Sequence, residues 1–95
     1  MTATRPGKDS MNEGTFKREL GKAQTMQRVE ADPMKAAYWR GFQRGIRRAY
    51  HGARFGTEDE HARFMDAAQS EDEERAAIGR GYRDGFTFNG KDAAQ

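Results

Sequence analysis

The most constraining feature of this sequence is a twelve-residue segment that recurs forty positions further along the chain. Residues 35–46 align with residues 75–86, with five identical and three conservatively replaced positions. Both copies read Arg-Gly-aromatic-x-x-Gly-apolar, with two alanines one turn earlier. Two such copies are too few for a solenoid, which stacks three or more repeats. The repeat therefore predicts a compact, pseudo-symmetric pair of segments.

The repeated glycines predict that these two segments are helices that cross closely. A glycine inside a helix costs up to about 1 kcal/mol relative to alanine, so matched glycines need a structural reason. Two glycines four residues apart leave a smooth groove, which lets a second backbone approach. We expect a crossing built on Gly41, Gly45, Gly81 and Gly85, surrounded by Phe42, Ile46, Tyr82 and Phe86.

Capping signals and apolar spacing predict two helices in the first half of the chain. A weak apolar stripe, Phe16, Leu20, Ala23 and Met26, favours a helix over residues 15–30. The pair Asp32-Pro33 is a stronger start signal, since Asp caps free backbone N–H groups and Pro loses no hydrogen bond there. This helix should run to about residue 51, where a glycine can end it.

Two further helices are expected in the second half. Thr57 followed by Glu60 forms a capping box and predicts a short helix that buries Phe64, Met65 and Ala68. The run from residue 70 to residue 73 repeats this signal, so a fourth helix should extend to about residue 86. No stretch alternates with period two, which leaves an all-α helical bundle of about four helices.

Composition places these helices in one small domain with a thin core. The chain has 95 residues, of which 35% are hydrophobic and 34% are charged. We expect a disordered arm over residues 1–12, one helical domain over residues 13–90 and a disordered tail over residues 91–95. A small core supplies little surplus stability, so we also expect a homo-oligomer or a bound partner.

From the composition we expect no disulfide, no thiolate metal site, no membrane span and no secretion signal. The chain has no cysteine, which excludes disulfides and thiolate metal sites, and we expect no cofactor. No apolar run approaches the length of a membrane span, and the first residues lack the apolar core of a secretion signal. These features favour a cytoplasmic protein, in the bacterial host cytoplasm if the chain is phage-encoded.

Charge is divided sharply along the sequence. Residues 35–54 hold six basic residues and no acid, whereas residues 55–74 hold eight acids and one arginine. Such a division predicts two opposite patches, which either face partners or neutralise each other within the fold or across a dimer.

The basic patch is a candidate nucleic-acid or partner-binding surface. At helical spacing one ridge of the second helix carries Arg40, Arg44, Arg47 and His51, with Arg48 nearby and Trp39 at the margin. Arginine forks suit phosphates and edge aromatics stack on bases, although a solvated or internally paired helix face is the alternative.

The acidic patch is a candidate surface for a basic partner protein. Its members are Glu58, Asp59, Glu60, Glu71, Asp72 and Glu73. Their position in the first turns of two helices also explains them, because carboxylates there cap and stabilise the helix dipole. The two histidines, His51 and His61, lie on different elements without metal-ligand spacing, and no catalytic motif is present, so we expect no enzyme.

The string from Arg40 to Ile46 resembles the first helix of the ribosome modulation factor family. That family carries Arg-Gly-aromatic-Gln-x-Gly-Ile there, and Gly81-Tyr82 resembles the Gly-aromatic pair of its second helix. The resemblance implies two helices joined by a connector, binding to small-subunit ribosomal RNA near the mRNA path and shutdown of translation. The connector here is longer and acidic, and it lacks the family's Cys-Pro-Tyr stretch.

Two functions follow as expectations. The first is a small regulatory protein that docks on the ribosome or another RNA-bearing machine through the arginine-rich helix face. The second is a phage or mobile-element protein that inhibits a host defence or processing complex by protein–protein binding, as anti-CRISPR proteins do, with a possible use of the acidic segment. A structural or oligomerising adaptor is a third class.

Overall fold

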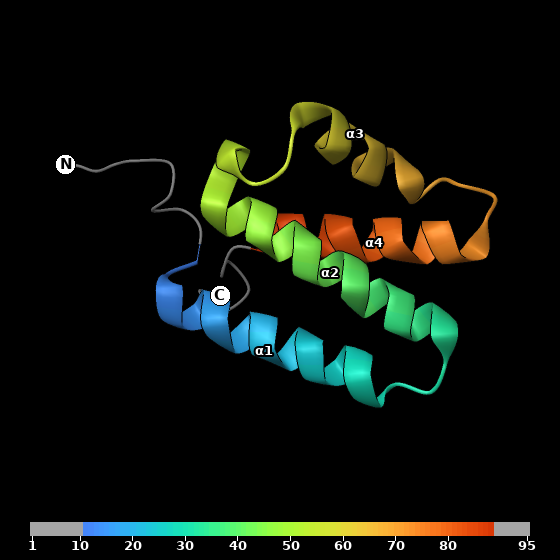
Figure 1. Cartoon of the computed structure of the whole chain (residues 1–95), viewed down its shortest axis with the longest axis horizontal. Helices are drawn as coiled ribbons and strands as arrows, with labels where there is room; N and C mark the ends of the chain where they lie inside the picture. The colour runs from blue at the N-terminus through green and yellow to red at the C-terminus, as the bar shows by residue number, and fades with distance from the viewer. Residues whose placement is uncertain (1–10, 89–95) are drawn as a thin grey trace.

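Residues 11–88 are described by the computed structural model, and they form four α-helices and one short 3-10 helix (Figure 1). The helices are α1 (Glu13–Val29), α2 (Pro33–His51), α3 (Glu58–Ala67) and α4 (Glu73–Thr87), and the 3-10 helix η3 (Gly52–Arg54) follows α2. The prediction of an all-α bundle is confirmed. No helix within this part of the chain has the length and apolar character required to cross a membrane.

Each helix begins at a side chain that accepts a hydrogen bond from a backbone N–H of its first turn. Asp32 and Thr57 cap α2 and α3 as expected, at 2.9 and 3.0 Å. Asn12 caps α1, which therefore starts two residues earlier than predicted. The cap of α4 is Asp72 and not Ser70, whose hydroxyl instead accepts the N–H of Asp72.

The predicted bounds of the domain need one change at its start. Met11, assigned to the arm by the sequence, is only 4% exposed and belongs to the hydrophobic core. The remaining predicted arm, residues 1–10, and the predicted tail, residues 91–95, lie outside the described residues.

Helices α2 and α4 cross through the repeated glycines, as the sequence predicted. A Cβ atom on Gly41 would lie closer than 3.0 Å to the carbonyl of Ile78, and one on Gly81 would meet the carbonyl of Tyr38 in the same way. Gly45 and Gly85 face the carbonyls of Tyr82 and Phe42. Real Cβ atoms are not found at such separations, so only glycine permits this approach.

These contacts are related by the same forty-residue offset as the sequence repeat. Gly41 lies against Ile78, and Gly81 lies against Tyr38. The two glycines are forty positions apart in the chain, and so are Tyr38 and Ile78. The two helical hairpins, α1–α2 and α3–α4, are thus related by a pseudo-two-fold axis through the crossing, with α1 and α3 on opposite sides of it (Figure 1).

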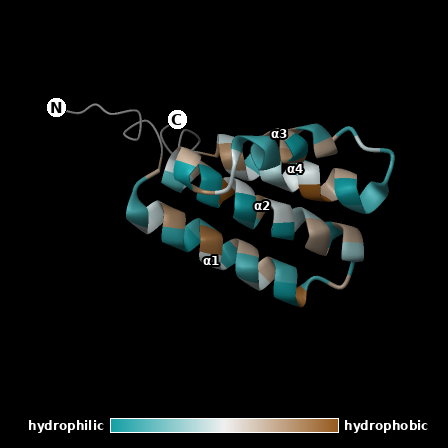
Figure 2. Cartoon of the chain, turned by 45° about the horizontal axis from the view of Figure 1, so that its top comes forward, coloured by the Kyte–Doolittle hydropathy of each residue, from teal (hydrophilic) through white to brown (hydrophobic). Residues whose placement is uncertain are grey.

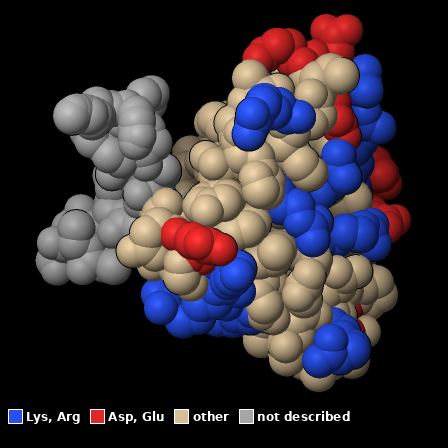
Figure 3. Space-filling view, turned by 60° about the vertical axis from the view of Figure 1, so that its left-hand side comes forward, with Lys and Arg blue, Asp and Glu red and all other residues tan. Residues whose placement is uncertain are grey.

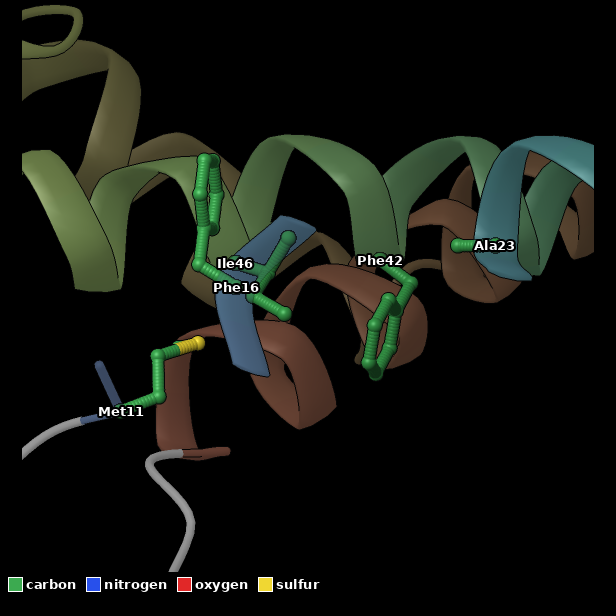
Figure 4. Close-up of a cluster of buried hydrophobic side chains, with 5 residues drawn as sticks. All are labelled: Met11, Phe16, Ala23, Phe42 and Ile46. Atoms are coloured by element: carbon green, nitrogen blue, oxygen red, sulfur yellow. The ribbon is translucent and has the colours of Figure 1, made fainter. Parts of the chain in front are cut away.

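The hydrophobic core is small and lies mainly between α1 and α2. Its buried members, drawn in Figure 4, are Met11, Phe16, Ala23, Phe42 and Ile46. Teal, hydrophilic positions cover much of every helix, and brown positions are confined to short stretches (Figure 2). The α3–α4 pair is held differently, because Gly79 brings α4 against the backbone of Ala67 and Ala68. Ala67 is buried, whereas the three residues predicted to be buried, Phe64, Met65 and Ala68, are only half-buried.

Candidate partner-binding site

The arginine ridge of α2 is engaged by acids from the second hairpin. Arg40 pairs with Glu74 at the start of α4 at 3.1 Å, and both side chains are about half exposed. Arg44 pairs with Glu60 of α3. In Figure 3 blue and red surfaces alternate along one edge of the molecule, in keeping with such pairing. The alternative of internal neutralisation therefore describes these two arginines better than a free phosphate-binding ridge.

Arg48 is a structural residue rather than a surface one. Its guanidinium is buried, and it donates to the carbonyl oxygen of Phe55 at 3.0 Å and to Glu58 at 2.7 Å. Both bonds tie the end of α2 to the segment that enters α3. Arg48 was predicted to bind a partner, but this position leaves it inaccessible to one.

The remaining predicted residues of the basic patch differ in accessibility. Arg47 is half-buried and has no carboxylate within 4.0 Å among the described residues. His51 is exposed, but its ring packs edge-on against Phe16. Trp39 is half-buried and packs on Tyr38 and on the core residue Phe42. Of these, Arg47 is best placed to contact another molecule.

The predicted acidic surface is also partly used within the fold. Glu58 and Glu60 are bound by Arg48 and Arg44, and Asp72 caps α4. Asp59, Glu71 and Glu73 are exposed and make no ion pair within residues 11–88. The acids therefore do not form one continuous free surface.

The structure reveals a cleft of about 310 Å³ that is lined by residues of α3 and α4. Ala67, Phe64 and Ile78 supply its apolar lining, and three charged residues complete it: Glu60, Arg63 and Arg75. Arg44 reaches Glu60 from α2, and the Arg40–Glu74 pair lies next to Arg75 in the chain. We call this feature the arginine-edged cleft.

Two arginines of this cleft are available to a ligand. Arg63 and Arg75 are exposed, and neither lies within 4.0 Å of a carboxylate in the described part of the chain. Glu60, the acid in the lining, is already neutralised by Arg44. The cleft therefore presents an apolar lining with a net positive edge, which favours a ligand that combines an apolar group with a carboxylate or phosphate.

The aromatic part of the lining is already packed. Tyr82 stacks on Phe64 with ring centroids 4.7 Å apart and an interplanar angle of 9°, and the Arg44 guanidinium lies 5.2 Å from the same ring. His61 Nδ1 is hydrogen-bonded to the Tyr82 hydroxyl at 2.8 Å. Burial raises the pKa of Tyr82, so this hydroxyl stays protonated. A nucleic-acid base could stack on Phe64 only by displacing one of these neighbours.

Arg63 and Arg75 were not among the residues singled out in the sequence, because Arg63 lies within the run dominated by acids and Arg75 follows it directly. A signal was nevertheless present. Glu60, Arg63, Phe64 and Ala67 follow the i, i+3, i+4, i+7 spacing of one helix face. That spacing places an arginine beside an apolar stripe, but the partner helix that completes the cleft cannot be read from it.

A second hollow of about 370 Å³ lies between α2 and α4 and is lined by Tyr38, Arg80, Arg83, Asp84 and Thr87. The Tyr38 hydroxyl donates to Asp84 at 2.5 Å, and burial followed by this hydrogen bond raises the pKa of Tyr38. The Asp84 carboxylate inside this hollow makes it less suited to an anion than the arginine-edged cleft.

Within residues 11–88 no three His, Asp or Glu side chains gather closely enough to hold a metal ion. Comparison with protein-family models, curated proteins and solved structures gives no match for this chain.

Proposed function

We propose that the chain is a non-enzymatic binding protein that recognises a protein partner through the arginine-edged cleft. The observation that carries this proposal is the pairing of an apolar lining with two exposed arginines, Arg63 and Arg75, neither of which has a carboxylate within 4.0 Å among the described residues. An apolar side chain flanked by a carboxylate fits such a site, because the lining accepts the first and the guanidinium forks accept the second. Occupying a surface of a host complex in this way would make the chain an inhibitor.

RNA binding is the second candidate function, favoured by Arg47, which has no ion pair among the described residues, and by the resemblance to ribosome modulation factor. Two observations rank it lower. Arg40 and Arg44 would have to leave carboxylates to reach phosphates. The glycines that carry the resemblance are used in the α2–α4 crossing, which explains them without a nucleic acid.

A pull-down from bacterial lysate with RNase-treated and untreated arms tests this proposal. The tagged wild-type chain is compared with Arg63→Glu/Arg75→Glu and with Arg80→Glu/Arg83→Glu, which makes the same charge change at the second hollow. We expect the wild-type chain and Arg80→Glu/Arg83→Glu to retain the same protein in both arms. We expect Arg63→Glu/Arg75→Glu not to retain it.

Two results would count against the proposal. Retention that disappears with RNase supports the RNA alternative. In that case replacing Arg40, Arg44 and Arg47 with glutamine should lower the slope of log affinity against log salt by about 0.7 to 0.9 for each phosphate that is no longer bound. Retention that both double variants preserve would place the binding surface elsewhere on the molecule.

A further inference from the structure

The arginine-edged cleft selects a chemistry that this chain itself displays at the end of α1. Val29, the last residue of α1, is 65% exposed, and it is the exposed large hydrophobic side chain of the described residues. Glu30 and Asp32 follow it closely. We call residues 29–32 the α1–α2 turn, and it presents an apolar side chain followed by two carboxylates, with the exposed Arg28 before it.

The carboxylates of this turn are not neutralised by cations. Glu30 accepts the backbone N–H of Asp32 at 3.2 Å, and Asp32 accepts the backbone N–H of Met34 at 2.9 Å. Neither lies within 4.0 Å of a lysine or arginine among residues 11–88. The turn therefore carries unpaired negative charge, whereas the cleft carries unpaired positive charge on Arg63 and Arg75.

The turn cannot reach the cleft of its own chain. It follows α1, which packs on α2, whereas the cleft is formed by α3 and α4 on the opposite side of the crossing (Figure 1). The α1–α2 and α3–α4 connections lie at the same end of the molecule (Figure 1), and Arg75 of the cleft follows the second of them closely in the chain. A second copy that approaches this end can therefore exchange contacts with the first.

We propose that two copies of the chain form a two-fold dimer in which the α1–α2 turn of each docks into the arginine-edged cleft of the other. Val29 covers the apolar lining, and Glu30 pairs with Arg63 and Arg75 of the second copy. A two-fold interface repeats both contacts and closes the assembly at two chains. The small core supports this arrangement, since Ile46 is the largest fully buried side chain of the described residues.

The dimer also has a regulatory consequence, which rests on the proposed function of the cleft. Because the second copy and a protein partner use the same lining and the same two arginines, self-association and partner binding exclude each other. A partner with a higher affinity would convert the dimer into a one-to-one complex.

Sedimentation velocity on charge-exchanged variants tests the dimer. Glu30→Lys places a cation opposite Arg63 and Arg75, and Arg63→Glu/Arg75→Glu places acids opposite Glu30, so each variant alone should be monomeric where the wild type is dimeric. Mixed in equal amounts, the two variants have complementary charges at both docked turns, one with exchanged and one with native charges, and should form a one-to-one heterodimer. Arg80→Glu/Arg83→Glu should remain a dimer, and circular dichroism checks that every variant is helical.

Val29→Ser provides a second, uncharged test, because the substituted side chain is exposed and the fold does not depend on it. It should weaken the dimer at least tenfold. A wild-type chain that is monomeric at micromolar concentration and low salt overturns the proposal, as does a dimer that these variants leave intact. The pull-down separates the two proposals. Glu30→Lys keeps the cleft, so it should still capture the protein partner, and a failed dimer with successful capture leaves the proposed function standing.

Discussion

Glycine has a role at the α2–α4 crossing that can be separated from its low helix propensity. Gly41 faces the backbone carbonyl of Ile78, where a Cβ atom has no space. Gly21 lies inside α1 with nothing within 4 Å of a Cβ atom. Replacing each of these helix-interior glycines with alanine is therefore expected to change the free energy of unfolding in opposite directions.

We expect Gly41→Ala to destabilise the protein and Gly21→Ala to stabilise it. Alanine at position 41 must push two backbones apart, and overpacking of this kind costs roughly 1–3 kcal/mol. At position 21 alanine gains up to about 1 kcal/mol from helix propensity. For a domain of this size a change of about 1 kcal/mol corresponds to about 4–8 °C in melting temperature, so thermal denaturation resolves both effects. An unchanged or higher melting temperature for Gly41→Ala would show that the crossing is looser than described.

Tyr38 should make stability fall at alkaline pH. Its pKa in the unfolded chain is the ordinary 10.0, and burial together with the Asp84 hydrogen bond raises it in the folded protein. The folded state therefore holds this proton more tightly, so the stabilisation is complete below the unfolded pKa and is lost as pH rises toward the folded value. Tyr38→Phe should flatten the decline of melting temperature above about pH 10. An equally steep decline in the variant would assign it to other groups, Tyr82 among them.

At the level of the elements, the arginines of α2 differ in their importance for the fold: the fold requires Arg48 but not Arg47. Arg48 is 6% exposed and hydrogen-bonded to Phe55 and Glu58, whereas Arg47 is half-buried with no carboxylate within 4.0 Å among the described residues. Sequence position does not distinguish them, because they are adjacent and share one residue type.

Replacing Arg48 with methionine should destabilise the protein by roughly 1–3 kcal/mol, since the Phe55 carbonyl loses its donor and α2 loses its tie to the next helix. Arg47→Gln should change stability by less than about 0.5 kcal/mol, as surface substitutions usually do. Urea denaturation of the two variants measures both. Equal losses would mean that Arg47 also has a partner in the fold.

Sequence predicted the helices well because their signals are local. Asp32-Pro33 and the Thr57 capping box fix the starts of α2 and α3, and the matched glycines predict the crossing. The side-chain contacts around the candidate site could not be predicted, because they depend on pairing between elements. The packing of α3 on α4 determines which acid reaches Arg44. It also places Arg63 and Arg75 at the edge of one cleft. Neither arrangement has a local signature in the sequence.

At the level of the whole molecule, the two hairpins depend on each other. The α2–α4 crossing is the most extensive contact between helices, and it joins residues from opposite halves of the chain. Within each half, one helix pair supplies little buried apolar surface, and an isolated helix as short as the ten-residue α3 is marginal in water. Folding should therefore be one cooperative event that requires both halves.

We expect the chain, when divided after Gly56, to fold only when its halves are combined. Residues 1–56 and 57–95 each lack the partner of their glycine groove, so each alone should show weak helical circular dichroism and no cooperative melting. Division at this point keeps the Arg48 bond to Phe55 within one fragment and leaves Thr57 to cap α3 in the other. Titration of one fragment with the other should restore helicity up to a one-to-one ratio. A fragment with Gly41→Ala should fail to restore it, because the groove is then closed to α4. Cooperative melting of either fragment alone at low concentration would show that a single hairpin suffices, and the crossing would then join two independent units.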